Sequence, residues 1–480
     1  MKKDTYKTLL FILFEIYSLF TLTCCKKFLD IDAPTTSTNA ENVYEHDNTA
    51  IAVLTGLYAQ MMNSDFYTGG ITSISLLTEL SADNLVLFSL NRLEYLSYYQ
   101  NSLNADYKNT ELLGNYFSNL YPRIYTINAA IEGLTKTSSL TPLVKERLLG
   151  EAYFLRAFYY FYLTNLYNEV PLVLTTDYTK NTVIARSPTA DVYRQMVSDL
   201  QQSQSLLKDN YVDASILKNT SERVRPNRSA ASALLARVYL FNKNYAAAEL
   251  AATEVINKTS QYKILPLNAV FLRNSTETIW ALQPVKTGFN TDEGAIFLMP
   301  EGPSGNKLFY ASPSLMASFE DSDKRLTEWT GNATSNGTDY PYIAKYKADA
   351  NNNTVTEYNI VLRLAEQFLI RAEARAEQNN INGAQEDLNT IRQRAGLLPI
   401  TAHDRSEIIS YIFNERRVEL FTEWGHRWLD LKRNSKINQL MQEAELYKGG
   451  DWQSYKALYP IPNTEISLNT RLTQNTGYTN

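Results

Sequence analysis

Cysteine is nearly absent from this chain: its 480 residues include only two, Cys24 and Cys25, and these are adjacent. A disulfide framework needs well-separated cysteines, and a ring between two neighbours would connect no distant parts of the chain. Histidine is also scarce, and His46, His403 and His426 have no second ligand-type residue at the spacing of a metal site. We therefore expect no metal site and no cofactor.

Positive charge in excess is also missing, since the formal net charge is −5 and the isoelectric point is near 5.6. Nucleic-acid binders usually present a basic surface to the phosphates, so we expect no nucleic-acid partner. The sequence has no Gly-rich phosphate loop, nucleophile elbow or HExxH helix. We therefore predict no catalytic residue.

The first residues are typical of a secretion signal. Lys2, Lys3 and Lys7 give a positive start, and the stretch from Thr8 to Thr23 is mostly apolar. A membrane-spanning helix needs roughly 20 apolar residues, whereas this stretch is shorter and contains Glu15. A cleaved signal is therefore favoured over a helical membrane anchor.

The adjacent cysteines stand where a bacterial lipoprotein signal ends. Leu22 lies three residues before Cys25, as in the box that precedes the lipid-bearing cysteine, although Glu15 and Cys24 depart from the usual pattern. We predict that residues 1–24 are the signal peptide and that Cys25 is acylated. Burial of acyl chains contributes about 0.8 kcal/mol per methylene, enough to hold a protein at a membrane. The alternative is a strained disulfide between Cys24 and Cys25.

Apolar residues three and four apart predict amphipathic helices in the first half of the chain. One helix is expected from Glu41 to Met62 and another from about Thr110 to Thr135. A third should begin after Thr141, with Pro142 at its first position, and end near Asn168. The sequence is predicted to be mostly α, with an N-terminal part of about residues 25–225.

Two later stretches match each other when they are aligned at a constant offset. Each has the pattern of a helix, a short polar turn and a second helix that begins with a small residue, which is the tetratricopeptide spacing. The aligned positions are Ala236, Tyr239, Tyr245, Ala248 and Val255 in the first stretch and Ala372, Arg375, Ile381, Ala384 and Ile391 in the second. We predict tetratricopeptide-like units at about 225–260 and 360–435, with degenerate units from helices at Lys145–Asn168 and Glu407–Arg433.

The region between these units, about residues 260–360, is richer in Gly, Pro, Asn and Ser. It is predicted to be a loop-rich insertion with a few short strands, at "ETIWALQPV" and "PYIAKYK". The segment from Phe66 to Leu103 is predicted to be a second insertion. Loops on a rigid scaffold often carry binding residues.

Tyrosine is abundant, with 33 copies against 19 Phe and 5 Trp, and it combines apolar ring faces with a hydroxyl. Trp424 and Trp428 recur at helical spacing and Trp280 lies in a strand-like stretch, so we expect all three in the core. Aromatic residues without such a pattern are better surface candidates: Phe66, Tyr67, Tyr98, Tyr99, Phe289, Phe309 and Tyr310.

Three carboxylates, Glu415, Glu419 and Glu423, are spaced to share one face of the predicted helix at 407–433. Such a set could pair for acid–base chemistry, but arginines are interleaved with it. Arg427 lies four residues after Glu423, an ordinary spacing for a helical ion pair. We interpret these carboxylates as structural.

Several blocks along nearly the whole chain carry a family resemblance: "CKKFLDIDAP" from Cys25, "TELSADN" from Thr78, "GEAYFLRAFYYFYLTNLYNEVPLVL" from Gly150, "RPNRSAASALLARVYLFNKNYAAAELAATEVI" from Arg225, "VLRLAEQFLIRAEARAEQNN" from Val361, "NERRVELFTEWGHRWLDLKR" from Asn414 and "LYPIPNTEISLN" from Leu458. Together they resemble the SusD/RagB family of outer-membrane lipoproteins of Bacteroidetes.

The resemblance implies a helical scaffold of tetratricopeptide-like pairs, anchored by lipid to the outer membrane and exposed at the surface. Members of this family are not enzymes; they capture nutrients, usually oligosaccharides, and deliver them to a SusC-type TonB-dependent transporter. RagB-like members handle peptides, so a peptide ligand and a tetratricopeptide scaffold without a small ligand stay as alternatives, and a glycosidase is the remaining one.

Sugars need flat rings for their C–H faces and planar polar groups for their hydroxyls. The polar segment around "NRLEYLSYYQN" and the short "GFN" stretch offer this mixture. The predicted ligand-binding residues are Arg92, Tyr98, Tyr99, Asn101, Phe289, Asn290 and Tyr310. Asp83 and Asn84 belong to a block that resembles the family scaffold and are weaker candidates.

Overall fold

A computed structural model describes residues 42–63, 70–106, 115–349 and 354–478. The chain divides into two units after Val43. Of the first unit only Asn42 and Val43 are described, in a 3-10 turn that spans Asn42–Tyr44. The predicted lipid acceptor, Cys25, lies outside the described residues. The second unit, Tyr44–Asn480, holds the rest of the described chain.

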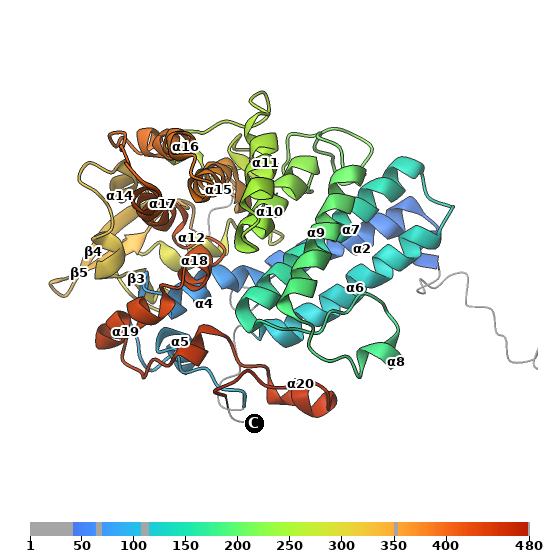
Figure 1. Cartoon of the computed structure of the whole chain (residues 1–480), viewed down its shortest axis with the longest axis horizontal. Coiled ribbons are helices and arrows are strands. Elements are labelled where there is room, and N and C mark those ends of the chain that lie inside the picture. Colours follow the sequence, from blue (N-terminus) through green and yellow to red (C-terminus); the bar gives the residue numbers. More distant parts are fainter. Residues whose placement is uncertain (1–41, 64–69, 107–114, 350–353, 479–480) are drawn as a thin grey trace, which may run out of the picture. The chain divides into compact units, whose positions relative to one another are not determined.

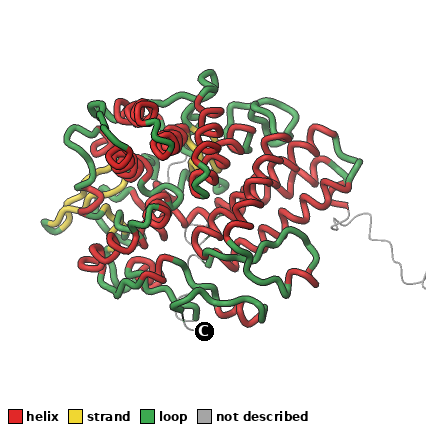
Figure 2. Tube along the Cα trace, viewed as in Figure 1, coloured by secondary structure: helices red, strands yellow, loops and turns green. Residues whose placement is uncertain are grey.

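Helices make up most of this unit (Figure 2), which confirms the predicted fold class. In chain order the α-helices are α2 (Asp47–Met62), α4 (Ile74–Ser81), α5 (Leu93–Tyr99), α6 (Tyr116–Lys136), α7 (Pro142–Tyr167), α8 (Tyr178–Asn181), α9 (Thr189–Leu206), α10 (Arg228–Phe241), α11 (Tyr245–Ile256), α12 (Asp292–Phe297), α13 (Pro313–Met316), α14 (Lys324–Glu328), α15 (Leu364–Glu377), α16 (Ile381–Arg394), α17 (Arg405–Leu420), α18 (His426–Arg433), α19 (Ile437–Lys448) and α20 (Asn463–Leu468). Among the described residues, no helix is long and apolar enough to cross a membrane.

The helices pack in a row that follows the chain order (Figure 1). Helix α6 packs on α7, α7 on α9, α9 on α10 and α10 on α11. The row then passes directly from α11 to α15, and continues through α16 and α17. The long region between α11 and α15 therefore leaves the helical row and returns to the neighbouring helix.

Helix α7 begins and ends where the sequence predicts. Thr141 is its N-cap and Pro142 its first residue, where the missing N–H of proline costs nothing. Asn168 ends the helix in a backbone conformation with φ of 67°. The middle of the helix is fully buried, and Phe158 and Trp280 meet edge to face with ring centroids 5.3 Å apart. Trp280 is thus a core residue, as predicted.

The two tetratricopeptide-like repeats share their turn as well as their helices. Lys243 and Asn379, which occupy equivalent positions in the two repeats, both adopt a left-handed conformation, with φ of 58° and 61°. Asn244 caps α11 by accepting a hydrogen bond from the N–H of Ala247, and Asn380 caps α16 in the same way. The small residues predicted at the close contacts are completely buried: Ala236, Ala248, Ala372 and Ala384. The repeat spacing is therefore confirmed at the level of individual turns.

The strands are short, and in the described part of the chain they form three two-stranded antiparallel sheets. Their bounds are β1 (Leu85–Leu87), β2 (Thr278–Leu282), β3 (Phe309–Ala311), β4 (Thr330–Ser335), β5 (Thr338–Ile343) and β6 (Asn359–Arg363). The pairs are β1 with β3, β2 with β6, and β4 with β5. β2 and β5 overlap the two strands predicted from the sequence.

The single helix predicted from Glu407 to Arg433 is wrong, because the chain turns sharply between α17 and α18. Thr422, Trp424 and Gly425 all have positive φ, at 55°, 43° and 77°. At Gly425 a Cβ atom would lie 2.9 Å from the hydroxyl oxygen of Thr78 on α4, so the close approach of α4 also requires glycine. Trp424 is nonetheless buried, as predicted, and so is Trp428 on α18.

The predicted pairing of Glu423 with Arg427 is also wrong. With the helix interrupted between them, Arg427 donates two hydrogen bonds of 2.7 Å to Asp83. Glu423 instead pairs with Lys345 and Arg363, at 2.5 and 2.7 Å. The break thus gives each charged group a partner from a distant part of the chain.

The insertion predicted at 66–103 is wrong for its described part, since residues 70–103 hold a 3-10 turn, α4, β1 and α5. Every residue of α4 is buried. Apolar residues are interspersed there with Ser, Thr and Glu, and this hid the helix from a search for one apolar stripe. Serine and threonine fit a buried helix because they can donate to its own carbonyls, as Thr78 does to Ile74 at 2.6 Å.

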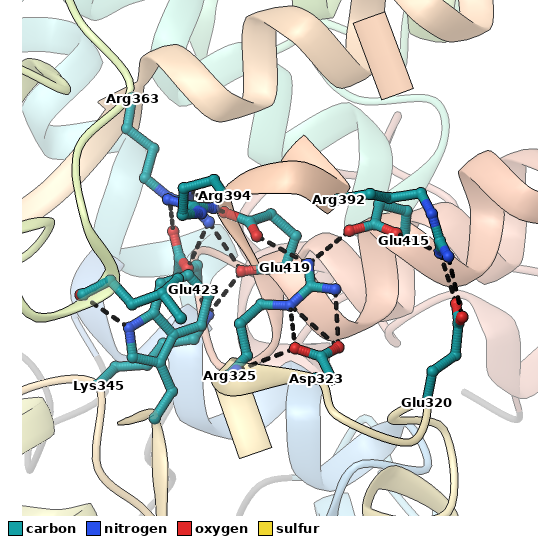
Figure 3. Close-up of polar contacts among 12 residues, drawn as sticks. Glu320, Asp323, Arg325, Lys345, Arg363, Arg392, Arg394, Glu415, Glu419 and Glu423 are labelled. Carbon is teal, nitrogen blue, oxygen red and sulfur yellow. Dashed lines mark hydrogen bonds and ion pairs between the residues drawn. The ribbon is translucent and has the colours of Figure 1, made fainter. Parts of the chain in front are cut away.

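A network of buried ion pairs surrounds α17 (Figure 3). Arg325 of α14, completely buried, contacts Asp323 at 2.8 Å, Glu415 at 2.6 Å and Glu419 at 3.0 Å. Arg363, at the end of β6, contacts Glu419 at 2.5 Å. Arg392 and Arg394 of α16 also pair with Glu415 and Glu419, respectively. The glutamates of α17 are therefore structural, as the sequence predicts.

The cations of the network keep Glu419 ionised. Burial acts to raise the pKa of Glu419, but Arg394, Arg363 and Arg325 together hold it well below the usual range for glutamate. Removing one cation would leave several buried carboxylates without a full set of partners.

We therefore expect Arg325→Met, which preserves much of the side-chain volume, to lower the free energy of unfolding by about 3 to 5 kcal/mol. Equilibrium urea denaturation followed by circular dichroism measures the change. Arg405→Met is the matched control, because Arg405 begins the same helix α17 but pairs with Glu377 at an exposed position. That variant should lose less than about 1 kcal/mol. Equal losses for the two variants would show that the network is not important for stability.

Candidate functional site

An exposed group of aromatic rings lies where the β1–β3 sheet meets the β4–β5 hairpin. We call Phe88, Tyr310 and Tyr340 the aromatic surface. The ring centroids of Phe88 and Tyr340 are 5.6 Å apart and those of Tyr310 and Tyr340 are 5.4 Å apart, both in edge-to-face geometry. Phe88 is 45% exposed, and the two tyrosines are partly exposed.

Local backbone structure explains why these rings point outward. Strand β3 alternates, so Phe309 and Ala311 are buried while Tyr310 between them is not. Phe88 directly follows β1 and is held by a hydrogen bond of 2.8 Å from its N–H to the carbonyl of Leu308. Tyr340 lies on β5 opposite Ala333. In the view of Figure 1, β3, β4 and β5 lie together on the left side.

One polar residue is next to Tyr340 in the chain, and the segment that follows Phe88 carries another. Asp339, next to Tyr340, accepts a hydrogen bond of 2.6 Å from Thr334 across the hairpin, and this bond holds the pKa of Asp339 below its ordinary value. Arg92 pairs with Glu94 at 2.6 Å, and its guanidinium lies 5.3 Å from the ring centroid of Tyr95. Flat rings beside hydrogen-bonding groups can hold the C–H face and the hydroxyls of a sugar.

The predicted exposure of Tyr98 and Tyr99 is wrong. They are 1% and 2% exposed, because α5 turns them inward together with Tyr95 at helical spacing. The ring of Tyr98 packs edge to face on Tyr459, with centroids 5.7 Å apart. The ammonium of Lys448 lies 5.2 Å from the ring centroid of Tyr99. Neither tyrosine presents an open ring face to a ligand.

Two predicted amides also serve the protein itself. Asn290 is completely buried, and its side chain bonds to the carbonyl of Thr354 and the N–H groups of Thr356 and Glu357 at 2.9 to 3.1 Å. Asn101 has a positive φ of 49° and donates to the carbonyl of Ser81 at 3.0 Å. A ligand role for Asn290 is therefore wrong, and Asn101 serves to close a turn.

The remaining candidates have different outcomes. Tyr310 belongs to the aromatic surface, Arg92 lies on the segment between β1 and α5, and both stay predictions. Phe289 is partly exposed, with the ammonium of Lys286 lying 4.9 Å from its ring centroid, and it also stays a prediction. Phe309 is buried, which contradicts its predicted exposure. The earlier surface candidates at positions 66 and 67 lie outside the described residues.

Sequence reasoning missed Phe88 and Tyr340. A signal for Tyr340 was present, because Asn336 and Gly337 form an Asn-Gly turn, with φ of 51° and 75°, between two strands. Asn-Gly flanked by alternating residues is a strong hairpin signal. Phe88 gave no comparable signal, since its exposure depends on how β1 pairs with β3, a strand that comes much later in the chain.

The weaker candidates, Asp83 and Asn84, are buried in the scaffold. Although burial acts to raise it, Arg427 and Arg417 hold the pKa of Asp83 well below its usual range. Asn84 donates to Glu79 at 2.7 Å and accepts from Arg417 at 3.0 Å. Asp83, which follows α4, thus pairs with α17 and α18, and Asn84 connects α4 with α17.

Carboxyl groups suited to acid catalysis are sealed inside the protein. Burial raises the pKa of Glu79 to about 7 and that of Glu293 to about 8. Each accepts a hydrogen bond from a buried asparagine, Asn84 or Asn359, and neither belongs to the aromatic surface. Within the described residues, no group of three or more His, Cys, Asp and Glu side chains is placed to hold a metal ion.

The fold and its exposed rings define a helical-repeat protein of the tetratricopeptide type with a loop-borne aromatic surface. The SusD family model matches residues 318–478, and a model described as starch-binding associating with outer membrane matches residues 27–240. The chain belongs to the SusD/RagB family.

Individual relatives match most of the chain. A SusD-like protein of Formosa agariphila is 24% identical over 537 aligned positions, which cover 97% of this chain and 99% of the relative. The solved structure of a SusD superfamily protein from Bacteroides vulgatus has a TM-score of 0.77 at 20% identity, covering 90% of this chain and 99% of its own. A laminarin-binding SusD-like protein has a TM-score of 0.70 at 23% identity, covering 89% and 99%.

Proposed function

We propose that this protein binds an oligosaccharide on the aromatic surface and delivers it to a SusC-type TonB-dependent transporter. In this proposal it is anchored at the outer face of the outer membrane by a lipid on Cys25. The observation that carries the proposal is the group of exposed rings at Phe88, Tyr310 and Tyr340, which pack on one another edge to face and leave the group open to solvent.

The comparisons support a carbohydrate ligand. One matching family model is named for starch binding, and one structural neighbour is named for binding laminarin, a glucan. The rings beside Asp339 suit such a ligand without any chemistry on it. Binding without turnover also fits the burial of Glu79 and Glu293. Hydrolysis would require carboxyl groups in contact with the glycosidic bond, and a bound sugar cannot reach these two.

The first test of this proposal removes one ring. Tyr340→Ala should weaken binding of the preferred oligosaccharide by about tenfold, because an aromatic contact contributes ~0.5 to 1.5 kcal/mol beyond area burial and tenfold is ~1.4 kcal/mol. A panel of soluble glucans and other oligosaccharides is titrated into the full chain by calorimetry.

Tyr178→Ala is the matched control, since Tyr178 is 75% exposed on α8 and lies outside the aromatic surface. It should bind as the parent does. Unchanged affinity of Tyr340→Ala, with the variant folded by circular dichroism, would contradict a role for the aromatic surface.

The lipid anchor predicts a clear difference between the adjacent cysteines. Cys25→Ala should move the protein out of the membrane fraction and abolish its labelling by a fatty-acid probe. Cys24→Ala should change neither result, because Cys24 leaves with the signal peptide. Persistent labelling of Cys25→Ala would exclude Cys25 as the acceptor.

The transporter partnership is tested by affinity purification from outer membranes in mild detergent, with the neighbouring genes expressed. A large TonB-dependent β-barrel should be recovered in about equal amount. Arg325→Met serves as a folding control, because a destabilised scaffold should recover less of the barrel. Repeated recovery of this chain alone would contradict delivery to such a transporter.

A further inference from the structure

A pocket of about 460 Å³ lies between α2, the segment from Val212 to Arg225 and the residues that follow β2. We call it the α2 pocket. It shares no lining residue with the aromatic surface. Its volume falls in the range of about 300 to 1,000 Å³ that is common for small-molecule sites.

The inner wall of the α2 pocket is fixed by buried polar contacts. Arg225, 4% exposed, donates to Glu151 at 2.6 Å and to the hydroxyl of Thr55 at 2.5 Å. The hydroxyl of Tyr58 donates to the same carboxylate at 2.9 Å, and the ring of Trp280 meets that of Tyr58 edge to face. These side chains are held in place without a ligand, which lowers the entropic cost of binding.

The outer wall is a short loop closed by pairing between Val212 and Asn219. Inside the loop the N–H of Asp213 donates to the carbonyl of Lys218 at 2.9 Å. Ile216 is 2% exposed and has φ of 68°, a left-handed conformation that is rare for a β-branched residue. Such strain costs of order 1 to 3 kcal/mol and persists only where packing imposes it. The loop therefore has one defined shape.

The lining combines acceptors with apolar atoms. Hydrogen bonds from Ser215 hold the pKa of Asp213 below its ordinary value, so this carboxylate is an acceptor at neutral pH. Glu222 is oriented by Arg273, with an Nε to Oε1 distance of 3.0 Å, and the exposed residue Gln283 also lines the cavity. Val224, Leu282 and Pro284 supply apolar contact area.

The charges favour a neutral ligand over an acidic one. Among the described lining residues, Arg225 carries the one positive charge, and its guanidinium is already paired with Glu151. Asp213 would repel a sulfate or a uronate, whereas the charge of Glu222 is matched by Arg273. The carboxylate oxygens of Asp213 and Glu222 can instead accept hydrogen bonds from hydroxyl groups, while the apolar wall contacts C–H groups.

We propose that the α2 pocket binds one sugar ring of a neutral carbohydrate, as a site separate from the aromatic surface. This inference rests on the proposed function for the class of ligand. The α2 pocket and the aromatic surface would then be two distinct carbohydrate sites on one chain.

The test uses the full chain in detergent and a panel of neutral monosaccharides, namely glucose, galactose, mannose and xylose, with glucuronate as the acidic comparison. Saturation-transfer NMR detects binding and titration gives affinity. Ala214→Trp places a large side chain at the pocket wall and should raise the Kd for the monosaccharide by about tenfold or more. Ala246→Trp, at an exposed position of α11, is the matched control and should have no effect.

A smaller substitution tests the pocket even if Ala214→Trp disrupts the fold of the loop. Gln283→Ala removes one amide and should raise the Kd for the monosaccharide about three- to tenfold, the usual range for the loss of one hydrogen bond. Gln393→Ala, exposed on α16, is its control. Tyr340→Ala should leave monosaccharide binding unchanged, because Tyr340 does not line the pocket.

The outcomes separate this inference from the proposed function. If the parent binds oligosaccharides but none of the monosaccharides, or binds glucuronate more tightly, the pocket assignment is overturned and the proposed function stands. Monosaccharide affinity that survives both Ala214→Trp and Gln283→Ala also overturns the assignment. Failure to bind any oligosaccharide would overturn the proposed function, and the pocket assignment with it.

Discussion

The carboxylates of α17 constrain much of this structure, because they are buried ions that must be matched by cations from elsewhere. Glu415 and Glu419 of α17, together with Glu423 just after it, receive these cations from α14, α16, the end of β6 and Lys345 (Figure 3). A buried charge without a partner is strongly destabilising, so these segments must all be in place together. The β4–β5 hairpin lies in the chain between Arg325 and Lys345, both of which are fixed by the network. The position of Tyr340 therefore depends on ion pairs to which it does not itself contribute.

The aromatic surface and the α2 pocket show two ways of keeping a candidate binding site open in a chain that buries most of its large side chains. Edge-to-face packing on the neighbouring rings fixes Tyr310 and Tyr340 without covering them. In the pocket, Glu151 and Thr55 hold Arg225 against the wall. In both places the contacts that set the shape lie behind the exposed atoms, so the surfaces are preorganised.

Much of the fold could be predicted from the sequence, because its signals are local. Thr141 and Pro142 mark the start of α7, and the constant offset between the two matching stretches marks the repeats. The errors come from tertiary structure. Tyr98 and Tyr99 lie in a polar segment, yet α5 packs them inward against Tyr459 and Lys448, near the other end of the chain. The break after α17 places Glu423 and Arg427 beside partners that no spacing along the helix could indicate. Of the candidate site, Tyr310 was predicted, whereas Phe88 and Tyr340 depend on strand pairing.

The direct packing of α11 on α15 has a consequence for how such a protein can diversify. The chain leaves the helical row at the end of α11 and returns at the start of α15, which is its neighbour in space. The region between α11 and α15 therefore begins and ends at neighbouring helices. Doubling the length of a flexible loop raises the entropic cost of closing it by only ~0.6 kcal/mol. Surface residues of that region, such as Tyr310 and Tyr340, can therefore change while the stack of helix pairs keeps its register, whereas its buried residues Trp280 and Arg325 cannot. The scaffold and the residues that meet a ligand are thus free to change at different rates.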